Sequence, residues 1–345
     1  MLPVSYVLPF RSEREPPDEF IGYVNALTDH VEVVLVDGSP PPVFAAINEC
    51  RDRRVRHVRP DTDLDALANG KVRGVLTGLR AAAHDRIVIA DDDVRYSTTA
   101  LASIVASLDD ADVVRPQNYF DPLPWHALLD TARTLINRTT GGDWPGTLAV
   151  RRSALMPEGY DGNALFENLE LVRTVATGGG RARCRYDLMV RRLPPSTRHF
   201  WNQRVRQAYD EFARPWRLAT ALAVMPTLGA LLSTRRRRAA ASAFLLMPVL
   251  IAEVGRWRDG GRDVFPWLAS VAAPLWMLER GLCAWVALGA RATVGGVRYN
   301  GRVVALAANS PAVLTTRWAA RRSMTARTST GAGGSVACSP PVIPG

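Results

Sequence analysis

The apolar run at residues 87–90, which leads directly into Asp91, Asp92 and Asp93, constrains this chain more than any other feature. Its β-branched residues predict a strand that is buried on both faces. Carboxylates at the end of such a strand are costly unless a positive group lies beside them. Mg²⁺ usually takes one or two protein carboxylates together with phosphate oxygens of a substrate. The stretch therefore predicts a site for a cation and a diphosphate, with a solvated turn that closes the strand as the alternative.

Two further apolar runs precede this one. Residues 4–10 read as a strand stopped by Pro9, and residues 31–36 read as a strand that ends in Asp37. Lys71 then precedes a helical pattern over residues 72–79. Strands that alternate with helices predict a parallel sheet with crossover helices, and ligands bind such sheets beyond the carboxyl ends of the strands. Pro9, Asp37 and the three acids would meet there, and with Lys71 they predict a nucleotide-diphosphate site.

In this order the motifs resemble those of the family 2 glycosyltransferases, whose catalytic domain has the GT-A fold. The resemblance covers residues 3–207 and extends to membrane-bound members, the ceramide glucosyltransferase-like and bacterial lipid glycosyltransferases. Six segments carry it: Val36-Asp37-Gly38-Ser39, Gly70-Lys71, Asp91-Asp92-Asp93, residues 146–152, Glu167-Asn168-Leu169-Glu170-Leu171 and Gln203-Arg204-Val205-Arg206-Gln207.

The resemblance implies an inverting transfer of a sugar from a nucleotide-diphosphate sugar, expected to be a UDP-sugar, to an acceptor hydroxyl. It assigns Asp91 and Asp93 to a divalent metal, Mg²⁺ or Mn²⁺. It assigns the nucleotide sugar to Pro9, Asp37, Lys71, Asp91 and Asp92. The metal and Lys71 would stabilise the charge that builds up on the leaving group. Lys71 is the single lysine beside 42 arginines, and a site that needs a compact ammonium does not exchange it freely for a guanidinium.

Two departures from the family pattern affect the acceptor side. Asn168 stands where the family has its catalytic Asp, and Gln207 stands where membrane-bound members have Trp. An amide cannot accept a proton as a general base, so we expect the adjacent Glu167 to take over this role, with Glu170 structural. A non-catalytic protein that binds nucleotide sugars or scaffolds a membrane complex is an alternative that Asn168 favours.

Gln203 and Arg206 are three residues apart, so on a helix they share a face. The resemblance implies that they approach the acceptor or the departing diphosphate, which makes them candidate catalytic residues with Glu167 and Asn168. The alternative is an amphipathic helix on a membrane surface, with Arg204, Arg206 and Arg214 as solvated or lipid-facing charges. A sugar nucleotidylyltransferase is a rival for the whole site, but the loop at residues 9–14 lacks the glycines that such enzymes carry.

The positive charge belongs to the second part of the chain. Residues 1–202 hold 24 basic and 27 acidic side chains, whereas residues 203–322 hold 18 basic and 6 acidic ones. A pI of about 10.1 suits nucleic-acid binding, but no nucleic-acid motif accompanies it. We therefore expect a membrane partner and no nucleic acid, because the same region is the most apolar.

Four apolar runs occupy residues 218–234, 239–252, 264–278 and 281–290, and four arginines at residues 235–238 separate the first two. A spanning helix needs about 20 apolar residues. We favour a hairpin that dips into the inner leaflet of the cell membrane and keeps these arginines and the catalytic domain on the cytoplasmic side; a soluble all-α domain is the alternative. The expected organisation is an α/β catalytic domain (1–207), a helical membrane-associated region (208–322) and a disordered tail (323–345). These helices favour a lipid-linked acceptor.

Overall fold

The computed structural model describes residues 1–233, 237–299 and 301–331. Its first two hundred residues form an eight-stranded sheet in the order β3-β2-β1-β4-β7-β6-β8-β5. The bounds are β1 Ser5–Phe10, β2 Glu32–Asp37, β3 Arg56–Val58, β4 Arg86–Ala90, β5 Val94–Arg95, β6 Val113–Phe120, β7 Thr147–Arg151 and β8 Ala182–Arg192.

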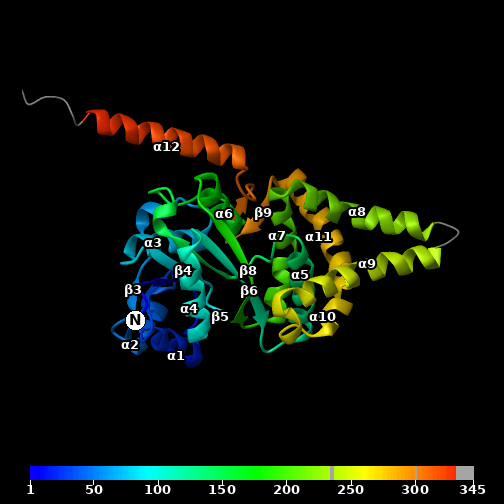
Figure 1. The fold of residues 1–345 in the computed structure, drawn as a ribbon, viewed down its shortest axis with the longest axis horizontal. Coiled ribbons are helices and arrows are strands. Elements are labelled where there is room, and N and C mark those ends of the chain that lie inside the picture. Colours follow the sequence, from blue (N-terminus) through cyan, green and yellow to red (C-terminus); the bar gives the residue numbers. More distant parts are fainter. Residues whose placement is uncertain (234–236, 300, 332–345) are drawn as a thin grey trace, which may run out of the picture.

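The strand order confirms the predicted α/β class. Strands β3, β2, β1 and β4 run parallel, β7 is antiparallel to both of its neighbours, and β6 and β8 are parallel again. The helices of this part are α1 Asp18–Leu27, α2 Pro41–Cys50, α3 Gly70–Ala81, α4 Thr98–Ala106, α5 Trp125–Thr139, α6 Glu167–Thr177 and α7 Thr197–Tyr209. In Figure 1, α1 to α4 lie on the left with the first strands of the sheet, whereas α5 and α7 lie further to the right, next to α11.

Strand β4 is buried on both faces, as its sequence predicts. Val88 and Ala90 pack into the core beneath α1, α2 and α4, whereas Ile87 and Ile89 pack into the core beneath α3. This alternation follows from the two-residue period of a strand. The three acids that follow β4 therefore leave the sheet at the centre of its carboxyl edge.

Helix α3 approaches the sheet closely because it carries glycines on its inner face. A Cβ atom on Gly78 would lie 2.3 Å from Val7 Cγ1, and one on Gly74 would lie 2.8 Å from Pro9 Cβ. The helix begins where the Asn69 side chain accepts hydrogen bonds from the backbone N–H groups of Lys71 and Val72. This N-cap satisfies donors that the first turn leaves unpaired. The close packing and the cap together fix Lys71 above the ends of β1 and β4.

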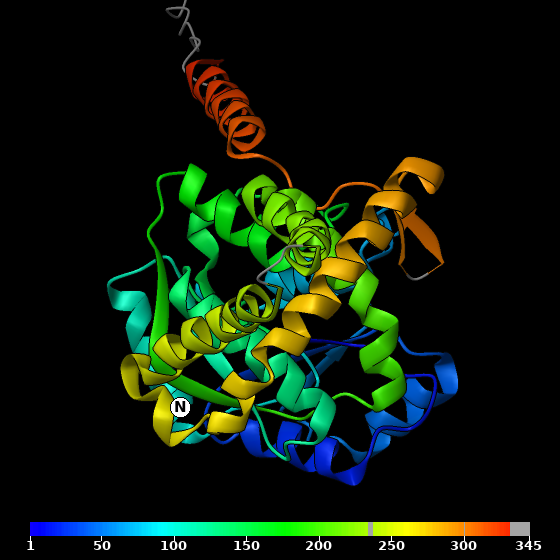
Figure 2. The same ribbon diagram turned by 90° about the vertical axis from the view of Figure 1, so that its right-hand side faces the viewer.

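The second half of the chain is mainly helical and packs against α5, α6 and α7 through two apolar clusters. Its elements are α8 Pro215–Leu232, α9 Arg237–Trp257, α10 Trp267–Val271, α11 Ala273–Val294, β9 Val297–Tyr299, β10 Arg302–Val304 and α12 Pro311–Gly331. Helices α8 and α9 project together from the body of the molecule (Figure 1). Helix α11 crosses α8 and α9 where they meet the α/β part of the molecule (Figure 2).

Among the residues that the structure describes, two helical segments are long and apolar enough to cross a membrane: Pro215–Leu232, and the 27-residue stretch Arg237–Asp263. They correspond to the first two apolar runs of the sequence, whereas the third run is interrupted between α10 and α11. The expected boundary after residue 207 falls inside α7. Residues 323–331 of the expected tail belong to α12, where alanine and arginine favour a helix. Arg235 and Arg236 of the four-arginine segment, and residues 332–345, lie outside the described residues.

Candidate active site

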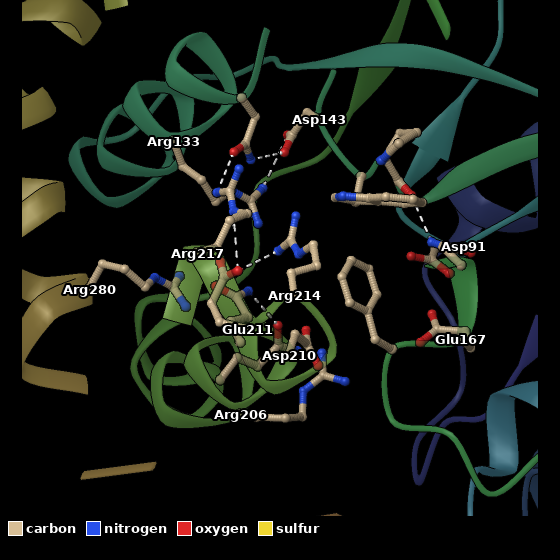
Figure 3. A pocket seen from close by; sticks show the side chains of 18 of the residues that line it. Asp91, Arg133, Asp143, Glu167, Arg206, Asp210, Glu211, Arg214, Arg217 and Arg280 are labelled. Atoms are coloured by element: carbon tan, nitrogen blue, oxygen red, sulfur yellow. Dashed lines mark hydrogen bonds and ion pairs between the residues drawn. The ribbon is translucent and has the colours of Figure 1, made fainter. Parts of the chain in front are cut away.

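A polar cavity of about 120 Å³ lies between the carboxyl edge of the sheet and helix α7 (Figure 3). Six residues that the sequence singles out line it: Lys71, Asp91, Glu167, Asn168, Gln203 and Arg206. Pro9, Asp37, Asp92 and Asp93 do not contribute to its lining. The fold thus gathers the phosphate-binding and acceptor-side candidates at one place, although more than a hundred residues separate Lys71 from Arg206.

Charges of opposite sign alternate at the sheet end of the cavity. Lys71 Nζ lies 2.5 Å from Asp91 Oδ1 and 2.8 Å from Glu167 Oε1. Arg192, on β8, places Nη2 3.3 Å from Asp91 Oδ2 and Nε 2.9 Å from Asp93 Oδ2. Burial would lower the pKa of Lys71, but the two carboxylates outweigh it and raise the pKa. The lysine is therefore a fixed cation, as the phosphate-binding role requires.

Gly146 allows this cluster to close. The Asp91 backbone N–H donates to the Gly146 carbonyl at 2.8 Å. A Cβ atom at Gly146 would lie 2.6 Å from Asp91 Oδ2 and 3.0 Å from Arg192 Cζ. The glycine that opens the 146–152 motif thus allows the loop before β7 to approach the acids after β4 closely.

The acids after β4 could bind a divalent cation if a substrate supplies the remaining oxygen ligands. Within residues 1–233, 237–299 and 301–331 no three potential ligands among His, Cys, Asp and Glu gather around one point. Asp93 Oδ1 is nevertheless buried without a hydrogen-bond partner in this part of the chain. Asp91 and Asp93 are hard oxygen ligands, and Mg²⁺ needs few of them when a diphosphate supplies the remainder. The residues present are compatible with Mg²⁺ or Mn²⁺, with Asp93 and Asp91 as the protein ligands.

Asp37 and Pro9 lie at the adjoining strand ends, where the sequence places them. The Asp37 side chain is fully buried; Oδ1 accepts from the Ser39 backbone N–H at 2.8 Å, and Oδ2 lies 3.1 Å from His57 Nε2. Burial would raise the pKa of Asp37, but the hydrogen bonds from His57 and Ser39 outweigh it and lower the pKa. This carboxylate is ionised and already bound within the fold, and its contact with a nucleoside stays a prediction. His57 gives no signal in the sequence.

Asn168 and Glu167 open helix α6 beside the cavity. Asn168 Nδ2 donates to the Pro145 carbonyl at 2.9 Å, which ties α6 to the loop before β7. Glu167 Oε1 lies 2.8 Å from Lys71 Nζ. Glu170, expected to be structural, is fully buried and accepts from the backbone N–H of Asn309 at 2.7 Å. The assignment of Glu167 as a base stays a prediction.

Helix α7 presents Gln203 and Arg206 to the cavity; its first turns are largely exposed, but Arg204, Ala208 and Tyr209 in its second half are buried. The Arg204 side chain is 2% exposed and pairs with Asp130 on α5, at 2.6 Å, and with Glu279 on α11. The alternative in which Arg204 is a solvated or lipid-facing charge is therefore wrong, because two buried carboxylates hold it. Arg206 lies with its guanidinium carbon 5.3 Å from the centre of the Tyr299 ring.

The far end of the cavity is rich in guanidinium groups. The sequence analysis named one of them, Arg214, as a solvated or lipid-facing charge, whereas its side chain is only 16% exposed and lines the cavity. We call Arg133, Arg214, Arg217 and Arg280 the arginine cluster; Figure 3 shows them around Asp143, Asp210 and Glu211. Glu211 pairs with Arg214 at 2.9 Å and with Arg217 at 3.1 Å, whereas Asp143 lies 3.4 Å from Arg133. In a chain with 42 arginines, no single one of them is conspicuous.

Asp210 lies between this cluster and the sheet end of the cavity. Burial raises its pKa to about 7, and the positive charges that oppose this rise are those of Arg206 and Arg214. The other charged groups that act on it are Glu167 and Glu211. Asp210 is consequently protonated in part near neutral pH, and the cavity is more positive than its formal charges suggest.

No protein-family model matches the sequence, and no curated protein does. Among solved structures, the chain is similar to a mannosyltransferase from Pyrobaculum calidifontis in complex with GDP-Man and Mn²⁺, at 17% identity over 94% of this chain and 86% of that one, with a TM-score of 0.43. A glucosyl-3-phosphoglycerate synthase from Mycobacterium tuberculosis in complex with Mn²⁺, UDP and phosphoglyceric acid matches at 17% identity over 57% and 73% of the two chains, with a TM-score of 0.39. A mannosyl-3-phosphoglycerate synthase from Rubrobacter xylanophilus matches at 16% identity over 58% of this chain and 70% of that one, with a TM-score of 0.40. At TM-scores below 0.5, these likenesses leave the activity of the chain to be argued from its own site.

Proposed function

We propose that this chain is a glycosyltransferase that moves a sugar from a nucleotide-diphosphate sugar, expected to be a UDP-sugar, to a lipid-linked acceptor at a membrane surface. The observation that carries the proposal is the ion-pair cluster of Lys71, Asp91, Glu167 and Arg192 at the carboxyl end of β4, which opens into the polar cavity. Ligands of parallel α/β sheets bind at this edge.

The cluster suits a reaction whose leaving group is a diphosphate. Lys71 and Arg192 are fixed cations, and fixed positive groups stabilise charge that develops as the bond to the sugar breaks. A divalent cation on Asp93 and Asp91 would add further positive charge to the diphosphate. Asp37 and Pro9 would contact the nucleoside, Asp92 the donor, and Gln203 and Arg206 the acceptor or the departing diphosphate. With a hydroxyl acceptor, Glu167 is the carboxylate that would take the proton.

The projecting helices support a membrane location. Leu246, Leu250 and Val254 of α9 are each more than half exposed, and their spacing of four residues places them on one face of the helix. Arg237 and Arg238 begin α9 at the end of this helix pair that lies farthest from the rest of the molecule, so the pair would lie along the anionic cytoplasmic surface of the membrane, with its exposed apolar face in the headgroup region. We therefore place the catalytic part at the cytoplasmic side of the cell membrane.

The test uses the purified full-length chain with added membranes, a panel of labelled nucleotide sugars and Mn²⁺, followed by organic extraction. Metal-dependent label in the organic phase is expected, and Asp93→Asn should abolish it, whereas the control Asp110→Asn, at an exposed position, should not. Label that appears only in water-soluble products would refute the lipid acceptor. Calorimetric binding of intact donor without turnover in any membrane extract would favour the non-catalytic alternative.

Membrane attachment is tested separately by co-sedimentation with vesicles that contain anionic lipid. Replacing Leu246, Leu250 and Val254 together by serine should release the protein from the vesicles. The matched control is Val303→Ser, which changes an exposed valine outside the hairpin. Equal binding of both variants would contradict the proposed attachment through α9.

A further inference from the structure

The polar cavity continues into an apolar groove of about 650 Å³ between the projecting helices and the catalytic part. Glu211, Arg217 and Arg280 line both spaces. The groove itself is lined mainly by large apolar side chains of α8, α9 and α11, among them Trp216, Val224, Phe244, Met247, Ile251 and Trp276. The arginine cluster therefore lies between Lys71 and an apolar groove formed by helices that could lie in a membrane.

The arginine cluster is not balanced by its own carboxylates. Arg280 is 5% exposed, and its Nε and Nη1 atoms have no hydrogen-bond partner within the described parts of the chain. Arg133 Nε and Arg214 Nε are also buried there without a partner. Buried cationic groups are costly when they lack a partner.

The neighbouring acids are already engaged. Asp143 accepts from Thr134 and Asn137, each at 2.7 Å, and Glu211 is shared by Arg214 and Arg217. Arg280 is therefore left for another anion. A phosphate group matches this arrangement, because its oxygens accept several hydrogen bonds from planar guanidinium groups at once.

We propose that the acceptor is a long-chain lipid monophosphate, with its phosphate among the arginine cluster, its hydrocarbon chain along the apolar groove, and a phosphate oxygen as the nucleophile. This inference rests on the proposed glycosyl transfer. It names the substrate class that the acceptor side of the same cavity takes. The charge of the arginine cluster and the apolar character of the groove match the two parts of such a molecule.

A phosphate nucleophile also accounts for the amide at position 168. The second pKa of a phosphate monoester is about 6, so its oxygen is ionised at neutral pH and carries no proton to remove. That oxygen forms the bond to C1 of the sugar while the bond from C1 to the diphosphate oxygen breaks, and the nucleoside diphosphate leaves with the electron pair. No general base takes part. Asn168 can then donate its hydrogen bond to the Pro145 carbonyl, and Glu167 can form its ion pair with Lys71.

The test compares hexadecyl phosphate with hexadecanol as acceptors for the full-length protein in detergent, with Mn²⁺ and the labelled donor found active in membranes. Sugar should be transferred to the phosphate and not to the alcohol. Arg280→Met should raise the KM for hexadecyl phosphate about tenfold or more, while calorimetric affinity for the donor stays unchanged. Arg198→Met, at an exposed position on α7, should behave like the wild type.

A second measurement does not depend on a folded Arg280 variant. Hexadecyl phosphate should raise the unfolding temperature of the wild-type protein, because a ligand that binds only the folded state stabilises it. Hexadecanol and inorganic phosphate should have less effect, since each supplies one half of the ligand. Equal protection by inorganic phosphate would refute the lipid part of the inference.

Two other outcomes separate this inference from the proposed function. Transfer to hexadecanol at the rate seen with hexadecyl phosphate would overturn the phosphate acceptor and leave the glycosyltransferase intact. Failure of the protein to bind any nucleotide sugar would instead refute the proposed function, on which the inference depends.

Discussion

Replacement of Lys71 by methionine should reduce both the stability of the protein and its activity. Lys71 Nζ contacts Asp91 Oδ1 at 2.5 Å and Glu167 Oε1 at 2.8 Å, and the three side chains are 15–21% exposed. At an effective dielectric constant of about 20, each contact contributes roughly 6 kcal/mol of Coulomb attraction. Desolvation offsets most of this attraction while the pair is intact. Removal of the cation leaves Glu167 without its cationic partner and leaves Asp91 with Arg192 alone, so we expect the free energy of unfolding to fall by about 3 kcal/mol.

Two further variants separate charge from geometry. Lys71→Arg keeps the charge, so it should retain most of the stability, but its broader guanidinium should not fit the diphosphate and transfer should be lost. Arg73→Met is the matched control on the same helix, because Arg73 pairs with an Asp65 side chain that is 61% exposed. Such a pair contributes about 1 kcal/mol or less.

The assay is unfolding by urea and by heat, with EDTA present so that no metal binds the freed carboxylates. For a domain of about 200 residues, such as the α/β part, a loss of about 3 kcal/mol corresponds to a fall of roughly 6–12 °C in the unfolding temperature. Transfer is measured in the presence of Mn²⁺. If the Lys71→Met and Arg73→Met proteins unfold at the same temperature, the ion pairs of Lys71 do not support the site as reasoned.

Three other substitutions test separate parts of the site. Gly146→Ala places a methyl group 2.6 Å from Asp91 Oδ2, so transfer should fall by about a hundredfold, whereas Gly22→Ala, with no atom within 4 Å, should have no effect. Arg204→Met removes a 2% exposed cation from two carboxylates and should lower the free energy of unfolding in urea by about 3–5 kcal/mol; an unchanged transition midpoint would contradict this. Asp210 has a folded-state pKa of about 7, raised by burial, so its contribution to wild-type stability should fall as the pH rises from about 4 to 7. Asp210→Asn should remove this fall in urea titrations at several pH values, and parallel pH profiles would refute it.

The sheet and the position of Lys71 beside the acids after β4 could be predicted because their signals are local. Strand β4 shows its burial on both faces in four consecutive apolar residues, 87–90, and Lys71 follows an N-cap and precedes a helical pattern. The order of strands and helices then places their ends at one edge of a sheet. Nothing beyond the sequence is needed for that step.

The acceptor end could not be predicted, because its parts meet only through tertiary packing. Arg133 comes from α5, Arg214 precedes α8, and Arg280 comes from α11. No spacing links these positions, and arginine is too common in this chain to mark any of them. The structure also separates two arginines of α7 that the membrane-surface alternative treats alike, since Arg204 is buried between carboxylates and Arg206 faces the cavity.

Replacing Asn168 by the aspartate that family 2 glycosyltransferases carry at the corresponding place should impair the proposed transfer. Asn168 Nδ2 donates to the Pro145 carbonyl at 2.9 Å, and an ionised carboxylate has no proton to donate. Asn168→Asp would therefore leave that carbonyl unpaired, at a cost of about 1–3 kcal/mol, and add a negative charge to a cavity that we propose receives a phosphate. Transfer to hexadecyl phosphate should fall, and transfer to hexadecanol should not appear. A variant that gains activity toward the alcohol would show that the amide replaces a base, and that the natural acceptor is a hydroxyl after all.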